Sequence, residues 1–243
     1  MKKAIGYVYV IAAAVCWGFL GLFNRVLTAA GVSLLNMMPL RFGGTAILFT
    51  VFCMMFKQQV FHIKLRHLPI FLGSGLISML LVLCGCALVS GIVGSDVGIS
   101  LEGLLMGLAS ELCYGGYTIF THYGMRYCDS FTMAYWTFLI AGIASLFLVD
   151  GPALLSALAE PRTGLAALGL MVMGTALPFT LYTKGLETVE SGKAAIIANI
   201  EPVMSAVIGV TVFQETLGLW TLVGIVLVLS GVVVLACEKE PDK

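Results

Sequence analysis

Two ionic residues stand inside long apolar stretches of this sequence, where charge is costly. Arg41 is the one charged residue of the stretch 26–56, and Glu201 is the one charged residue of the stretch 194–213. A charge at bilayer depth costs at least about 2.5 kcal/mol, so each should face protein, water or the headgroup region. For Arg41 two interpretations are open: it lines a cavity, or its helix starts late and the side chain reaches the outer headgroups.

Glu201 is followed by Pro202, which lacks a backbone donor and should loosen the helix around Asn199. A carboxylate beside freed carbonyls could bind a proton or a cationic group. The alternative is a kinked helix with a neutral, hydrogen-bonded acid. We expect Glu201 to face the interior and to be protonated much of the time unless Arg41 pairs with it.

An internal repeat places two aromatic residues at equivalent positions. The segment 12–23, AAAVCWGFLGLF, aligns with 109–120, ASELCYGGYTIF, which pairs Trp17 with Tyr114. The alignment continues without a gap to Ser33 and Ser130. Paired aromatic side chains could stack on a substrate, although ordinary packing is the alternative. The candidate substrate-binding residues are therefore Trp17, Tyr114, Arg41, Asn199 and Glu201, with Glu111 a weaker candidate.

The sequence lacks the patterns of common enzymes and pumps. It contains no HExxH, GxSxG or Walker pattern, so we expect neither an enzyme nor an ATP-driven pump. The seven cysteines form no CxxC pair beside histidine and are interpreted as packing residues, so no metal and no cofactor are expected. A net charge of zero, with Lys and Arg dispersed, argues against a nucleic-acid partner.

The elements that position these residues must be membrane helices. Of the 243 residues 60% are hydrophobic and only 11% are charged, so lipid must surround most of the chain. We predict an all-α polytopic membrane protein of about eight transmembrane helices. Their expected ranges are 5–29, 34–56, 68–90, 103–125, 131–149, 164–184, 194–213 and 217–237.

The basic residues predict the orientation of these helices. With eight helices, one set of ends and loops carries ten Lys and Arg residues and the other carries only Arg162. By the positive-inside rule the first set is cytoplasmic, so both termini should lie in the cytoplasm. That set consists of Lys2, Lys3, Lys57, Lys64, Arg66, Arg126, Lys184, Lys193, Lys239 and Lys243.

The two copies of the repeat should be inverted, because the helix at 5–29 starts inside and the helix at 103–125 starts outside. Inverted repeats relate two conformations, open to either side of the membrane, around one central site. The sequence therefore favours transport of a small-molecule substrate through an inner or plasma membrane by alternating access. Formation of a homo-oligomer is compatible with this organisation.

Three stretches resemble the EamA-type transporters of the drug/metabolite transporter superfamily. They are AAAVCWGFLGLFNRVLTAAGVSLLNMMPLRF, ASELCYGGYTIFTHYG and the closing run KAAIIANIEPVMSAVIGVTVFQETLGLWTLVGIVLVLSGVVVL. The resemblance implies ten helices in two halves of five. We expect a complete second repeat at 103–237 and a first repeat at 1–94 shortened to three helices.

The shortened first repeat affects the functional prediction. Its third helix begins like the third helix of the family, HLPIFLGSGLISML, but ends like a fifth, VLCGCALVSG. By comparison with the second repeat, about two helices are absent. We expect a secondary transporter of amino-acid-like or other small polar or amphipathic solutes; the alternative is a truncated, non-transporting membrane protein or packing partner.

Overall fold

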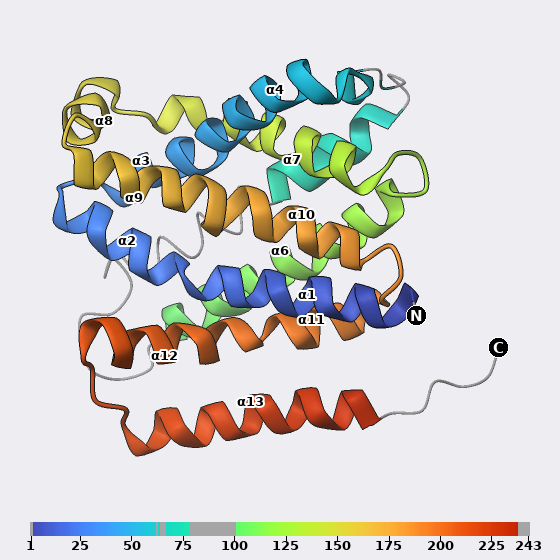
Figure 1. Cartoon of the computed structure of the whole chain (residues 1–243), viewed down its shortest axis with the longest axis vertical. Helices are drawn as coiled ribbons and strands as arrows, with labels where there is room; N and C mark the ends of the chain where they lie inside the picture. Colours follow the sequence, from blue (N-terminus) through green and yellow to red (C-terminus); the bar gives the residue numbers. More distant parts are fainter. Residues whose placement is uncertain (1, 62, 64–66, 78–100, 238–243) are drawn as a thin grey trace.

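The computed structural model describes residues 2–61, 63, 67–77 and 101–237 (Figure 1). These residues form helices and short connections, with no β-strand among them. Five helical segments of this part are long and apolar enough to cross a membrane: Ala4–Ala29, Leu35–Phe56, Ser130–Leu148, Pro161–Gly185 and Ser191–Phe213. The predicted all-α polytopic membrane fold is confirmed.

The first span consists of α1 (Lys2–Gly18) and α2 (Leu20–Ala29), which meet at Phe19. The chain leaves α2 through Gly31, whose φ of +84° is a left-handed conformation that favours glycine. There the amide of Val32 donates to the carbonyl of Leu27 at 3.0 Å, a pattern that closes helix C-termini. The turn therefore sends the chain back into the next span.

The second span changes its helical pitch near Arg41. It consists of α3 (Leu34–Met38), the π-helical segment η1 (Pro39–Gly43) and α4 (Gly44–Phe56). Within η1 the amide of Gly44 bonds to the carbonyl of Pro39, five residues earlier. π-helical turns are rare in proteins as a whole, but those that occur are often found at functional sites. Short η2 (Gln58–Phe61) follows.

The third predicted helix is described only as Leu68–Ile77, and the rest of 68–90 lies outside the described residues. Two longer helices follow, α6 (Leu101–Gly124) and α7 (Ser130–Ser145), and α7 continues into a short 3-10 turn, η4 (Leu146–Leu148).

Helix α8 (Gly151–Leu158) lies where the sequence predicted a loop. The carboxylate of Asp150 accepts a hydrogen bond from the amide of Ala153 at 3.3 Å, and Pro152 occupies the first turn. Both features are typical of helix starts. The connection between the spans is therefore partly helical.

The helical pattern of the span Pro161–Gly185 is also interrupted. It consists of α9 (Pro161–Met171), the π-helical segment η5 (Val172–Ala176) and α10 (Leu177–Gly185). Pro178 cannot donate to the carbonyl of Gly174, four residues earlier, and Gly174 lies inside η5. The irregularity next to Pro178 takes the form of a π-helical turn.

The last of the five spans is α11 (Ser191–Ala198) with α12 (Ile200–Phe213), and the apolar helix α13 (Leu219–Cys237) follows it. The helix breaks at Asn199, which is the last cap of α11 and the first cap of α12. Because Pro202 lacks its amide hydrogen, the carbonyl of Ala198 has no donor four residues on. The loosened helix predicted around Asn199 is confirmed.

Helix α1 packs at the centre of the bundle, against α10, α11 and α12 (Figure 1). Small residues allow these approaches: a Cβ atom on Gly185 would lie 3.0 Å from the carbonyl oxygen of Gly6, and one on Gly18 would lie 2.4 Å from the Cβ of Met204. In lipid, helices associate through such close van der Waals contact. The glycines therefore fix α1 against its neighbours.

The helix ends divide between two sides of the bundle. Helix α1 begins and α13 ends at the same side, where the connections α6–α7 and α10–α11 also lie (Figure 1). Helix α8 and the connection α12–α13 lie at the opposite side (Figure 1). The described start of α1 and end of α13 thus lie at the same side of the bundle, and the orientation of that side in the membrane stays a prediction.

Candidate functional site

Four aromatic rings meet where α1, α6 and α10 come together. The ring centroid of Trp17 lies 6.4 Å from that of Tyr114, 5.1 Å from that of Phe179 and 5.3 Å from that of Tyr182. Tyr114 and Tyr182 are 6.0 Å apart. We call these four residues the central aromatic cluster. It unites the two aromatic residues that the repeat alignment paired.

The central aromatic cluster continues into the buried core through Phe179. That ring lies 5.5 Å from Tyr117 and 5.0 Å from Phe138, both in edge-on contact. Edge-to-face contacts of this kind hold aromatic rings in defined orientations. The cluster, built from three helices, is therefore packed against a fourth, α7, through Phe138.

Two buried polar atoms of the cluster lack a hydrogen-bond partner among the described residues. Trp17 is 3% exposed, and neither its Nε1 nor the hydroxyl of Tyr114 has a partner within hydrogen-bond geometry among the described residues, although the Tyr114 hydroxyl interacts electrostatically with Tyr182. The Tyr182 hydroxyl is satisfied by Thr118 at 3.2 Å. A buried unsatisfied polar group costs about 1–3 kcal/mol, so such groups call for a specific explanation.

The depth of these atoms suits a substrate site. Trp17 lies near the middle of the span Ala4–Ala29, and Tyr114 lies near the middle of α6. Transporters with inverted repeats bind their substrates near the midplane, at the interface of the repeats. An indole N–H and a phenol hydroxyl at this depth can hydrogen-bond a solute that has left water.

Arg41 lies near Phe179 of the central aromatic cluster. Its guanidinium carbon lies 5.9 Å from the centroid of that ring and 5.7 Å from the centroid of Phe42, within the range of cation–π attraction. Its Nε donates to the hydroxyl of Thr175 at 3.2 Å. The structure thus places Arg41 inside the bundle, against protein.

Hydrogen bonds of Arg41 and Thr45 join the second span to the span Pro161–Gly185 near the two π-helical segments. The Thr175 hydroxyl donates to the carbonyl of Leu170 at 3.0 Å, and the Thr45 hydroxyl donates to the carbonyl of Met171 at 3.2 Å. Threonine hydroxyls therefore satisfy backbone groups that a regular helix would have satisfied. The joined segments can hold the guanidinium in a fixed position.

Glu201 lies on the face of α12 that packs against α1. Met204, one helical turn later, is the residue that Gly18 contacts, so Glu201 shares a face with that contact. Glu201 is partly buried and belongs to the same region as the central aromatic cluster.

The structure does not bring Asn199 to the cluster. Its side chain is exposed, and its amide donates to the carbonyl of Ala195 in its own helix at 3.3 Å. The side chain of Glu111, the weaker candidate, lies outside the part of the chain whose side chains are described. Of the five candidates, Trp17, Tyr114, Arg41 and Glu201 surround one region, and their role as ligands stays a prediction.

Sequence reasoning missed Phe179, Tyr182 and Thr175. The available signal was the Pro178 that loosens their helix, because two aromatic residues follow that proline at helical spacing. In the described part of the chain, no three His, Cys, Asp or Glu side chains gather in a way that could hold a metal ion.

The second half of the chain matches the profile of the EamA-like transporter family over residues 101–237. An uncharacterized transporter of Archaeoglobus fulgidus is 41% identical over 68 residues, 28% of this chain and 25% of that protein. The uncharacterized transporter YwfM of Bacillus subtilis is 26% identical over 174 residues, 70% of this chain and 57% of that protein.

A third relative is shorter. The multidrug resistance protein EbrB of Bacillus atrophaeus is 32% identical over 87 residues, 35% of this chain and 74% of that protein. The chain thus matches only a quarter to just over half of the two larger relatives. Because the profile covers more than half of a chain whose helices can cross a membrane, the protein is a multi-pass membrane protein that belongs to the EamA-like transporter family.

Proposed function

We propose that the protein is a secondary transporter that moves amino-acid-like or other small polar or amphipathic solutes across the inner membrane by alternating access. The observation that carries the proposal is that two buried polar atoms, Trp17 Nε1 and the Tyr114 hydroxyl, have no hydrogen-bond partner among the described residues. They lie near the middle of the span Ala4–Ala29 and of helix α6, and a solute that accepts or donates hydrogen bonds there would satisfy them. These atoms define the proposed substrate site.

The surroundings of this site favour a solute with both charges. Arg41 lies beside Phe179 and can bind a carboxylate, and Glu201, on the face of α12 that packs against α1, can bind an ammonium group. The central aromatic cluster suits an apolar or aromatic side chain. This arrangement supports an amino-acid-like zwitterion.

Alternating access is supported by contacts between the predicted repeats. Trp17 and Tyr114 pair in the repeat alignment and touch in the structure. The next pair of related spans also meets closely, because a Cβ on Gly142 of α7 would lie 3.0 Å from the Cα of Gly43. Contacts near a pseudo-two-fold axis are what inverted repeats require.

We assign the side that holds the start of α1 to the cytoplasm. The ends of α4 and α10 carry Lys57 and Lys184, whereas Arg162 lies at the start of α9 on the other side. Reporter fusions at Lys243 and at Pro161 should give opposite sidedness, with Lys243 inside. Equal sidedness at the two positions would contradict the topology.

The decisive experiment is uptake into liposomes that contain the purified full chain. A zwitterionic amino acid with an apolar side chain should be transported, and its amine-only and acid-only analogues should be poorer substrates. Preference for the amine-only analogue would instead indicate a transporter of organic cations. Transport of no solute of a broad metabolite panel would contradict the proposal.

The alternative is a non-transporting protein whose first repeat has lost a cavity-lining span. It is favoured if the chain moves no solute while a variant with that span restored transports one. Uptake by the unmodified chain excludes it.

A further inference from the structure

The first span and α12 meet along a line of small residues that begins beside the central aromatic cluster. A Cβ on Gly18 would collide with the Cβ of Met204, and a Cβ on Gly21 would lie 3.5 Å from the Oγ of Ser205. We call these contacts of Gly18 and Gly21 with α12 the glycine seam. Gly18 directly follows Trp17 in the chain, so the glycine seam starts at the depth of the proposed substrate site.

Beyond the glycine seam the two elements diverge. Helix α2 turns away from α12 and packs mainly on α9, where a Cβ on Gly169 would collide with the ring of Phe23 (Figure 1). The end of α2 and the α12–α13 connection nevertheless lie at the same side of the bundle (Figure 1). At this side, contact between α2 and the end of α12 therefore requires longer side chains.

Arg25 and Glu215 make such a contact. Nη1 of Arg25 donates to Oε1 of Glu215, and the guanidinium carbon lies 4.5 Å from the centroid of the Phe213 ring. Ion pairing and cation–π attraction therefore act on the same guanidinium. The two charged side chains are 51% and 47% exposed, so water screens their attraction. A contact of this strength can break and re-form within a transport cycle.

The end of α12 holds the carboxylate of Glu215 in place. The chain turns at Gln214, whose φ of +53° is left-handed, and the amide of Glu215 then donates to the carbonyl of Gly209 at 3.1 Å. A Cβ on Gly209 would lie 2.6 Å from Oε2 of Glu215, so the carboxylate packs directly on the helix. The acid that meets Arg25 is therefore fixed to α12.

We propose that Arg25 and Glu215 form a latch that closes the glycine seam at the outer side of the membrane. The latch rests on the proposed transport function, because it names the contact that separates the substrate site from that side. Arg25 belongs to the first predicted repeat and Glu215 to the second. Separation of the pair lets the repeats part along the glycine seam, as alternating access requires.

The test measures opening of the glycine seam and not transport. Met204→Cys in an otherwise cysteine-free full chain places one thiol in the seam, and its reaction with a water-soluble maleimide is followed in lipid nanodiscs. The intact pair should keep this reaction slow. Glu215→Gln and Arg25→Gln should each accelerate it about two- to fivefold, as expected for a half-exposed ion pair. Unchanged rates in both variants would overturn the latch.

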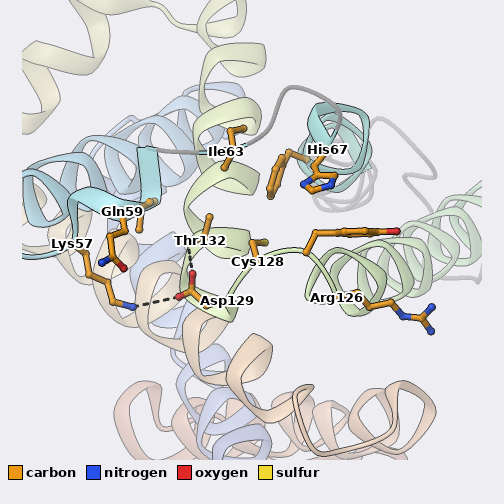
Figure 2. Close-up of a pocket in the computed structure, with 11 residues that line it drawn as sticks. Lys57, Gln59, Ile63, His67, Arg126, Cys128, Asp129 and Thr132 are labelled. Atoms are coloured by element: carbon orange, nitrogen blue, oxygen red, sulfur yellow. Dashed lines mark hydrogen bonds and ion pairs between the residues drawn. The ribbon is translucent and has the colours of Figure 1, made fainter.

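The matched control is Asp129→Asn, which breaks an ion pair outside the glycine seam. Figure 2 shows Lys57 directed at Asp129, and Nζ lies 3.3 Å from Oδ2. Lys57 also lies 4.7 Å from the centroid of Phe131, so this pair combines a cation, an acid and a phenylalanine ring as the latch does. The control should leave the labelling rate unchanged. Equal acceleration would indicate general loosening and would overturn the latch.

An exchange of the two charges separates their attraction from damage to the fold. Glu215→Arg alone places two cations together and should give the fastest labelling. Arg25→Glu combined with Glu215→Arg should return the rate to within about twofold of the unexchanged chain. A double variant as fast as Glu215→Arg would overturn the latch. Labelling that depends on the pair in a chain that transports nothing would contradict the transport function alone.

Discussion

Polar groups are buried without partners in the central aromatic cluster, but exposed and paired at Lys57 and Asp129, which lie at the end of α4 and the start of α7. In the cluster, Trp17 is 3% exposed and its Nε1 has no partner among the described residues. In the second region, the side chains of Lys57 and Asp129 are 48% and 54% exposed and form an ion pair. A buried polar group without a hydrogen-bond partner costs free energy because it has lost its contacts with water. An exposed ion pair contributes little because water screens its charges. We therefore expect large effects of substitutions in the first region and small ones in the second.

The largest effect should come from Gly18→Leu, beside the cluster. Even a Cβ at this position would lie 2.4 Å from the Cβ of Met204 and 3.2 Å from its backbone. We expect a loss of more than about 3 kcal/mol and little folded protein in size-exclusion chromatography. Gly115→Leu is the control, since a Cβ there meets nothing within 4 Å. Equal folding of both variants would show that α1 does not pack against α12 as described.

The second-largest effect should come from Arg41→Met and should appear as a loss of solute uptake. The substitution removes the hydrogen bond to Thr175 and the cation beside Phe179. A charged hydrogen bond contributes about 1.5–3 kcal/mol, so kcat/KM for a zwitterion should fall at least about tenfold. Arg41→Lys keeps the charge and should be intermediate. Unchanged uptake by Arg41→Met would remove Arg41 from the site.

Glu201→Gln should have a narrower effect. The amide has the same shape as the carboxylic acid, so the variant should fold normally and lose the pH dependence of uptake. If Glu201 instead pairs with Arg41, folding should also be impaired, because the cation would remain buried alone. A variant with normal expression and unchanged pH dependence would show that Glu201 only belongs to a kinked helix.

The smallest effect should come from the Lys57–Asp129 pair. The pKa of Asp129 is lowered in the folded protein, so its contribution to stability is present above the ordinary value of 3.8 and is lost as pH falls below it. For a half-exposed pair we expect about 0.2–1 kcal/mol. Thermal unfolding of the wild type and Asp129→Asn, compared between pH 7 and pH 3, should converge at the lower pH. A difference that grows on acidification would contradict this sign.

The thiol of Cys128, next to Asp129, should be poorly reactive. Burial, with the adjacent Asp129, raises the pKa of its thiol to about 11. The thiolate is the reactive form, so Cys128 should react slowly with maleimide at pH 7. Rapid labelling of Cys128 in an otherwise cysteine-free variant would contradict this environment.

The helices could be predicted because lipid imposes a simple rule. A span needs about 20 apolar residues, and the stretches around Trp17 and Glu201 satisfy that requirement without further information. The break at Asn199 followed from the missing amide hydrogen of Pro202. Each of these predictions depends on local chemistry alone.

The composition of the site could be predicted only in part. Arg41 and Glu201 stand out because charge is rare in apolar helices, and Trp17 and Tyr114 stand out because the repeat pairs them. Phe179 resembles other phenylalanines of apolar helices until the rotation of α10 is known. Helix α8 lies in 150–163, which the predicted ranges left between two helices, and Asp150 is its N-terminal cap.

The most direct test of the central claim compares Tyr114→Phe with Tyr182→Phe in thermal stability and in liposome uptake. Both variants lose one hydroxyl of the central aromatic cluster, but only the Tyr182 hydroxyl has a described partner, Thr118. Tyr114→Phe should keep or raise the melting temperature and strongly reduce uptake, whereas Tyr182→Phe should lose about 1 kcal/mol of stability. Wild-type uptake by Tyr114→Phe would contradict the claim that the unpartnered groups of the cluster bind the substrate.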